Sequence, residues 1–127
     1  MILAVGALLG FIAVAFGAWA EHGLRDNITA EHFRFLMTAV RYNQVHAVII
    51  AAIGLARLMD GKLANLPALG WSGVLFILGT ILFSFSIYLT VSVAIPSLVY
   101  ITPIGGLTIM VAWLLLFVTG WQVKNKL

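Results

Sequence analysis

The sequence predicts an all-α integral membrane protein, a four-helix bundle in which nearly the whole chain crosses the bilayer. Hydrophobic residues make up 63% of the 127 residues and charged residues only 9%, whereas an ordinary soluble domain is about 45–50% apolar. A helix needs about 20 apolar residues to cross the hydrocarbon core, and the chain has four stretches of that length. We expect these spans at residues 2–20, 40–58, 69–92 and 103–121, within a single transmembrane domain that covers residues 1–127.

The first span runs from Ile2 to Ala20 without a charged residue. A cleaved signal peptide is the alternative interpretation, because Ala18-Trp19-Ala20 resembles the small-residue pattern of a cleavage site. Signal peptides carry basic residues ahead of the apolar run, and no Lys or Arg precedes this one. We therefore expect the segment to be retained as a helix.

A polar stretch separates the first two spans, and its pattern is that of an amphipathic helix. Thr29 can cap the helix at its N-terminus. Apolar residues then recur at helical spacing: Phe33, Leu36 and Val40. We predict a short amphipathic helix over about 29–39 that lies at the membrane interface. It can bend directly into the second span, because no Gly or Pro interrupts the chain before Gly54.

Small residues gather on one face of the first span and recur in the second, where they let another helix backbone approach closely. They are Gly6, Gly10, Ala13, Gly17 and Ala20 in the first span, and Ala47, Ala51 and Gly54 in the second. The pattern predicts helix packing. It leaves open whether the partner helix belongs to the same chain or to a neighbouring protein.

The distribution of basic residues predicts the orientation, because cytoplasmic loops are enriched in Lys and Arg. The side that holds the N-terminus carries Arg57, Lys62, Lys124 and Lys126, and the opposite side carries Arg25, Arg34 and Arg41. We therefore expect a multi-pass protein of the cell membrane, in bacteria the inner membrane, with both termini in the cytoplasm.

Polar residues that could form a binding site concentrate in the half of the bilayer remote from the termini. The candidate ligand-binding residues are His22, Tyr42, Asn43, His46, Ser84, Ser86, Tyr88, Thr102, Gly105 and Gly106. The other half of the bundle is almost purely apolar, and no Asp or Glu lies inside a span. A channel or proton pump places polar groups through the whole membrane thickness, so the pattern argues against both.

The same side chains could instead stabilise the bundle. Serine and threonine hydroxyls can bond to carbonyls of their own helix, and Asn43 can link neighbouring helices. We expect His46, the deepest ionisable group, to be a neutral imidazole, because burial disfavours its charged form. Its expected hydrogen-bond partner is Ser84, Tyr88 or Asn43, which would give it a mainly structural role.

We expect neither a cofactor nor a metal ion. The chain has no cysteine, and no two histidines have the i, i+3 or i, i+4 spacing of a metal site on one helix. The basic residues are scattered singly, which argues against binding nucleic acid. Catalysis would need Ser84 or Ser86 activated by His46 and an orienting carboxylate. Since no carboxylate lies at that depth, we expect no enzyme.

Four motifs in order resemble a known family: Gly17–Leu24 (GAWAEHGL), Arg41–Ala47 (RYNQVHA), Leu82–Tyr88 (LFSFSIY) and Ile101–Gly106 (ITPIGG). They are similar to the small four-span membrane proteins of Domain of Unknown Function 423, related to eukaryotic transmembrane protein 256. The resemblance covers essentially the whole chain. Glu21 and Trp19 depart from the family pattern, which has a small residue and Phe at these positions. The resemblance implies an integral membrane protein and no settled activity.

Two functions remain open from the sequence. The first is a non-enzymatic bundle that packs against other membrane helices as a homo-oligomer or as an accessory subunit of other membrane proteins. The second is a binder or transporter of a small molecule or a lipid headgroup, which would use the polar cluster. In either case the protein is in contact with membrane lipid.

Overall fold

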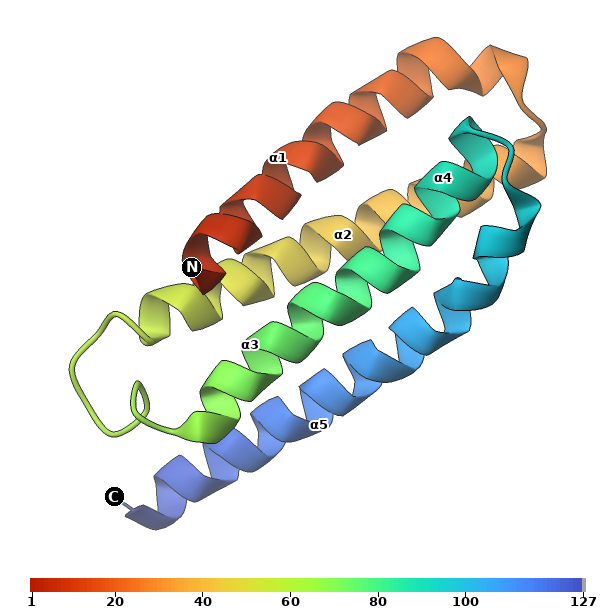
Figure 1. Cartoon of the computed structure of the whole chain (residues 1–127). Coiled ribbons are helices and arrows are strands. Elements are labelled where there is room, and N and C mark those ends of the chain that lie inside the picture. The colour runs from red at the N-terminus through yellow and green to blue at the C-terminus, as the bar shows by residue number, and fades with distance from the viewer. Residues whose placement is uncertain (127) are drawn as a thin grey trace.

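The computed structural model describes residues 1–126 and shows four long antiparallel helical rods (Figure 1). The first rod is α1 (Ile2–Trp19), extended by a π-helical turn η1 (Ala20–Leu24) and a 3-10 turn η2 (Arg25–Asn27). The second is α2 (Ala30–Ala56). The third combines α3 (Pro67–Thr80), the π-helical turn η3 (Ile81–Phe85) and α4 (Ser86–Ser92). The last is α5 (Thr102–Lys126), which follows the 3-10 helix η4 (Pro96–Ile101).

Within residues 1–126, four helices are long and apolar enough to cross a membrane, at Ile2–Asn27, Ala30–Ala56, Pro67–Ser92 and Pro96–Asn125. The predicted all-α bundle of four long apolar helices is therefore confirmed. The helix bounds differ from the predicted ones: α2, for example, begins at Ala30 and ends at Ala56, where the predicted span is 40–58. Both termini lie at the same end of the bundle, together with the loop between α2 and α3 (Figure 1). We call the opposite end, where η1, η2 and η4 connect the rods, the connection end.

The separate amphipathic helix predicted over 29–39 is not seen as an element of its own. Helix α2 is one continuous helix of 27 residues. Its N-cap is where the sequence predicts it, since the Thr29 hydroxyl accepts a hydrogen bond from the backbone N–H of His32 at 3.1 Å. The predicted amphipathic turns are the first turns of this helix. Their apolar face is part of the core, since Leu36 and Ala39 are fully buried, as is Asn43 one turn further along α2.

The glycines of α1 and α2 allow these two helices to pack backbone to backbone within the chain. A methyl group added at Gly6 would lie 2.6 Å from the backbone nitrogen of Ala51, and one at Gly54 would overlap the backbone of Leu3. The small-residue faces found in the sequence therefore meet each other. For Gly6 and Gly54, the partner helix therefore belongs to the same chain.

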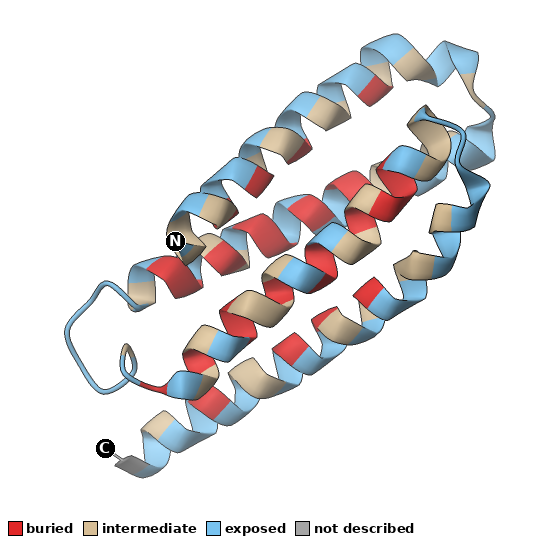
Figure 2. Cartoon of the chain, in the orientation of Figure 1, coloured by how far each residue is buried: buried red, intermediate tan, exposed pale blue. Residues whose placement is uncertain are grey.

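Helices α3 and α5 meet in the same way. A methyl group at Gly79 would lie 2.9 Å from the backbone nitrogen of Ile109, and one at Gly105 would overlap the backbone of Phe83. Buried residues lie mainly along the inner sides of α2 and α3 (Figure 2). One core cluster, around Phe76 and Ile50, extends from the middle of the bundle to Leu66 and Leu69 at the end that holds the termini. A second, around Leu36 and Tyr88, fills the connection end.

Candidate functional site

The predicted polar cluster divides into two parts, and the larger part joins helices to one another. The amide Nδ2 of Asn43 donates to the hydroxyl of Tyr88 at 3.2 Å, which links α2 to α4. The Ser84 hydroxyl donates to the carbonyl of Ala39 at 2.8 Å, which links η3 to α2. Asn43, Ser84 and Tyr88 are all buried. Each bond satisfies polar groups that would be costly in a lipid environment.

Ser86 and Thr102 make a third link, between α4 and α5. Their hydroxyl oxygens lie 2.7 Å apart, and the Ser86 hydroxyl also lies 2.8 Å from the carbonyl of Phe83. Since a hydroxyl has one proton to donate, Ser86 donates to the Phe83 carbonyl and accepts from Thr102. These two residues therefore hold the start of α5 against the third rod.

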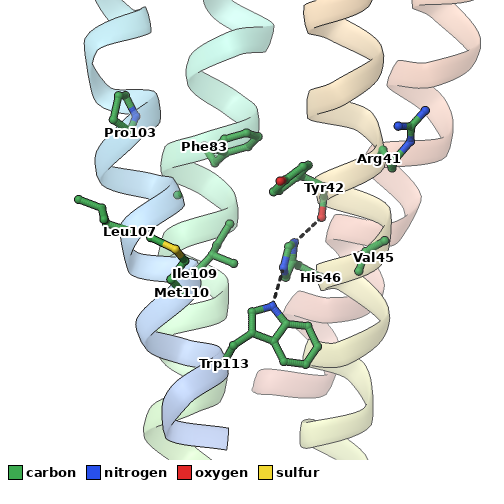
Figure 3. Close-up of a pocket in the computed structure, with 11 residues that line it drawn as sticks. Arg41, Tyr42, Val45, His46, Phe83, Pro103, Leu107, Ile109, Met110 and Trp113 are labelled. Carbon is green, nitrogen blue, oxygen red and sulfur yellow. Dashed lines mark hydrogen bonds between the residues drawn. The ribbon is translucent and has the colours of Figure 1, made fainter. Parts of the chain in front are cut away.

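His46 uses both ring nitrogens, but not with the predicted partners. Its Nδ1 lies 2.7 Å from the carbonyl oxygen of Tyr42, and its Nε2 lies 3.3 Å from the indole Nε1 of Trp113 (Figure 3). A carbonyl can only accept and an indole N–H can only donate. The proton is therefore on Nδ1, and the imidazole is neutral.

The partners predicted for His46, namely Ser84, Tyr88 or Asn43, are wrong. Three residues turn an α-helix by about 300°, so Asn43 and His46 point about 60° apart. This difference directs Asn43 toward α4 and His46 toward α5.

The smaller part of the cluster lines a groove between α2 and α5, which we call the lateral groove. Its volume is about 720 Å³. Its walls consist of Arg41, Tyr42, Val45, His46, Phe83, Pro103, Gly106, Leu107, Ile109, Met110 and Trp113 (Figure 3). Within residues 1–126, α2 packs on α1 and α3, and α5 packs on α3, whereas α2 and α5 do not pack closely on each other. The lateral groove is the space left between them.

The lateral groove opens to the side of the bundle and extends through about one leaflet. Val45, Leu107 and Met110 are 50%, 59% and 55% exposed on its rim, on surfaces that face lipid in a membrane. Pro103 and Trp113 lie at its two ends, about 15 Å apart along α5 at 1.5 Å per residue. This length is about half of the 30 Å hydrocarbon core.

The two ends of the lateral groove differ in chemistry. At its inner end Trp113 packs edge-on against Phe76, with ring centroids 5.0 Å apart, and bonds to His46. At the connection end Arg41 is the only charged lining residue. Beside it the Tyr42 ring stacks on Phe83 at 4.4 Å. The lateral groove is thus apolar over most of its length and carries a positive charge at its connection end.

The remaining candidate residues have other places. Gly105 is a packing residue, whereas Gly106 lines the lateral groove. His22 is exposed in η1 and is not a lining residue. In residues 1–126 no three His, Asp or Glu side chains gather closely enough to hold a metal ion.

Sequence reasoning missed Arg41, Phe83 and Trp113 as members of the site. In the sequence, Arg41 bears only on the orientation, as one of the basic residues on the side opposite the N-terminus. Trp113 had a usable signal, since it lies in the middle of a span, whereas tryptophan favours the membrane boundaries. A mid-span indole N–H needs an acceptor, and His46 supplies it.

Comparison with known proteins finds relatives that are membrane proteins. The family model described as "Protein of unknown function (DUF423)" matches residues 16–106. A UPF0382 membrane protein of Haemophilus influenzae is 34% identical over 123 residues, which is 97% of this chain and 95% of that protein. The inner membrane protein YgdD of Escherichia coli K12 is 32% identical, over 98% of this chain and 92% of its own length. YwdK of Bacillus subtilis is 32% identical, over 91% and 92%. No solved structure matches the chain.

Proposed function

Because the chain belongs to the DUF423 family of cell-membrane proteins, whose function is unknown, we propose a function from the geometry. The protein is a non-enzymatic membrane component that holds one amphipathic molecule in the lateral groove. The observation that carries this proposal is the groove itself. It opens to the side of the bundle, is about one leaflet deep, and has a positive charge only at its connection end. Its volume of about 720 Å³ falls within the range of about 300–1,000 Å³ that is usual for ligand sites.

The chemistry of the lining residues supports binding rather than catalysis. Nucleophilic catalysis requires a hydroxyl that bonds to a base, but Ser84 donates to a backbone carbonyl. Ser86 donates to another carbonyl. His46 has both nitrogens engaged by Tyr42 and Trp113, so it is not placed to activate either serine.

The expected oligomer rested on the small-residue faces of α1 and α2. The tightest contacts of those faces, at Gly6 and Gly54, are made within one chain, so they do not call for a second protein. The lateral groove is therefore the feature that we propose as functional.

We further propose that both termini are cytoplasmic and that the lateral groove lies in the outer leaflet. The bias of Lys and Arg toward the terminal side supports this orientation. We also propose that the first turns of α2, from Ala30 to Thr38, lie at the interface. The helix has 27 residues, which exceeds the roughly 20 needed to cross the hydrocarbon, and Glu31 and Arg34 are exposed in these turns, whereas Thr38 is half-buried.

The test is to fill the groove without disturbing the fold. The nearest atoms to a side chain added at Gly106 belong to the Phe83 ring, 3.8 Å away, and an added side chain at Gly120 meets nothing within 4 Å. Gly106→Leu should therefore fill the groove, and Gly120→Leu is a matched control on the same helix. Native mass spectrometry of the protein released from bilayers should show one retained lipid in the wild type and in Gly120→Leu. The lipid should be lost in Gly106→Leu. Equal retention by all three proteins would refute the proposal.

A further inference from the structure

We propose that the molecule held in the lateral groove is a two-chain glycerophospholipid with a net negative headgroup, and that it straddles α2. Arg41 contacts its phosphate, and Gln44 contacts an ester carbonyl. This inference rests on the proposed function and adds the class of lipid, the residues that select it and the position of its second chain.

Arg41 stands on the boundary between two hollows. It lines the lateral groove on one side of α2. On the other side it lines a hollow of about 350 Å³ between α1 and α2, together with residues that include Val14, Gly17 and Val40. We call this second space the α1/α2 hollow. One arginine side chain therefore lines two hollows that flank a single helix: it lies at the connection end of the lateral groove and between Met37 and Gln44 in the α1/α2 hollow.

The α1/α2 hollow adjoins a further hollow, and the two together are about one leaflet deep. They share Val14 and Gln44, and the further hollow, of about 300 Å³, reaches Gly6 and Ala51. From Arg41 to Ala51 the distance along α2 is about 15 Å, which matches the length of the lateral groove. A lipid with its phosphate at Arg41 could thus place one acyl chain on each side of α2.

Arg41 is not paired with a carboxylate in the part of the chain that the structure describes. It makes no hydrogen bond or ion pair within residues 1–126. Glu31 lies about 15 Å away along α2, beyond the screening length of about 8–10 Å. An exposed guanidinium at the edge of hydrocarbon favours an anionic partner, and its planar donors match a phosphate.

Gln44 supplies the second polar contact. It is exposed on the lipid-facing side of α2 and makes no hydrogen bond within residues 1–126. It follows Arg41 by three residues, so it lies on a neighbouring face about 4.5 Å deeper. Ester carbonyls lie below the phosphate of a glycerophospholipid, and a side-chain amide can donate to them. This contact accounts for an uncharged polar side chain that would otherwise face acyl chains.

The headgroup preference is tested in bilayers that contain equal amounts of phosphatidylglycerol and phosphatidylcholine, with native mass spectrometry of the released protein. The wild type should retain phosphatidylglycerol about fivefold over phosphatidylcholine, since one basic residue near the surface contributes about 1 kcal/mol. Arg41→Gln should reduce that ratio to about one, and Arg41→Lys should keep most of it. Arg34→Gln is the control, because Arg34 lies over the Phe35 ring and lines neither hollow.

The position of the second chain is tested by competition with lyso-phosphatidylglycerol, which has one chain. It should displace the bound lipid at least tenfold less effectively than phosphatidylglycerol. Equal competition would overturn the straddling arrangement. Gln44→Leu should lower retention of both phospholipids without changing the ratio between them.

The outcomes separate this inference from the proposed function. Suppose that a lipid is retained and that Gly106→Leu removes it, but that Arg41→Gln leaves the headgroup ratio unchanged. The inference about the lipid class then fails, whereas the proposed binding in the lateral groove is supported. If Gly106→Leu has no effect on retention, the proposed function itself fails. A cross-linked dimer in native membrane that Gln44→Leu abolishes would assign the α1/α2 hollow to a neighbouring helix and overturn the inference. Size-exclusion chromatography and circular dichroism of each variant establish that it is folded.

Discussion

The indole Nε1 of Trp113 donates a hydrogen bond to Nε2 of His46 across 3.3 Å, and this bond joins two helices that do not otherwise pack closely. It closes the inner end of the lateral groove, while the apolar rim above it stays open (Figure 3). His46 thus contacts the opposite wall of the groove through a partner that the sequence did not predict. Its mainly structural role stays a prediction, which the next variant tests.

Trp113→Phe should destabilise the protein by about 1–3 kcal/mol. The substitution keeps an aromatic ring against Phe76 but leaves Nε2 of His46 without its donor, and a buried polar atom without a partner is costly. Trp121→Phe is the matched control, because Trp121 is 59% exposed on the same helix. The free energy of unfolding in mixed micelles measures both. If the two variants are equally stable, the bond does not contribute to stability.

Much of the fold could be predicted from the sequence, because the bilayer imposes a simple rule. A chain in hydrocarbon must satisfy its backbone groups internally, so an apolar stretch of about 20 residues forms a helix. The spans and the N-cap at Thr29 follow from local patterns of this kind. The extent of α2 does not, because nothing in residues 29–39 says whether a helix ends at the interface or continues into the membrane.

The site was only partly predictable, because a groove depends on where helices fail to meet. Tyr42, His46 and Gly106 are in the lateral groove, but Asn43, Ser84 and Tyr88 are engaged in links between helices. Depth in the membrane is the same for both groups, and depth is what sequence position gives. What separates the two groups is which neighbouring helix each side chain faces, and this depends on where α4 and α5 lie around α2.

Gly105→Ala should destabilise the protein by about 2 kcal/mol or more, whereas Gly106→Ala should be neutral or slightly stabilising. A methyl group at Gly105 would overlap the backbone of Phe83, which cannot move aside without separating α5 from η3. Overpacking of this kind typically costs about 1–3 kcal/mol. At Gly106 the nearest atom is 3.8 Å away, and alanine is the better helix former. Equal stability of these neighbouring variants would contradict the close approach of α5 and η3.

Gly6→Ala and Gly10→Ala make the same comparison for α1 and α2. The added methyl group would lie 2.6 Å from the Ala51 backbone nitrogen at Gly6, but 3.7 Å from the Ala47 side chain at Gly10. We expect Gly6→Ala to lower the unfolding free energy by about 1–3 kcal/mol and Gly10→Ala to leave it nearly unchanged. If Gly6→Ala lowered stability only at high protein concentration, by shifting a dimer to monomers, the Gly6 contact would instead lie between two chains.

The link between Asn43 and Tyr88 should appear as a coupling energy in a double-mutant cycle. Tyr88→Phe keeps the ring stacked on Phe16, whose centroid is 3.9 Å away, but removes the hydroxyl that accepts from Asn43. The buried amide then lacks that partner, and its Oδ1 already has none among the described residues. In the Asn43→Leu background the same change removes a hydroxyl that has already lost its donor, so it should cost less. Hydrogen bonds between membrane helices average about 0.6 kcal/mol and reach about 1.7 kcal/mol, which sets the expected coupling energy.

The control is Tyr100→Phe, at a tyrosine that is 80% exposed, which should show no coupling with Asn43→Leu. If Tyr88→Phe behaves like Tyr100→Phe in both backgrounds, the bond between α2 and α4 does not hold the connection end together, and the buried position of Asn43 needs another explanation.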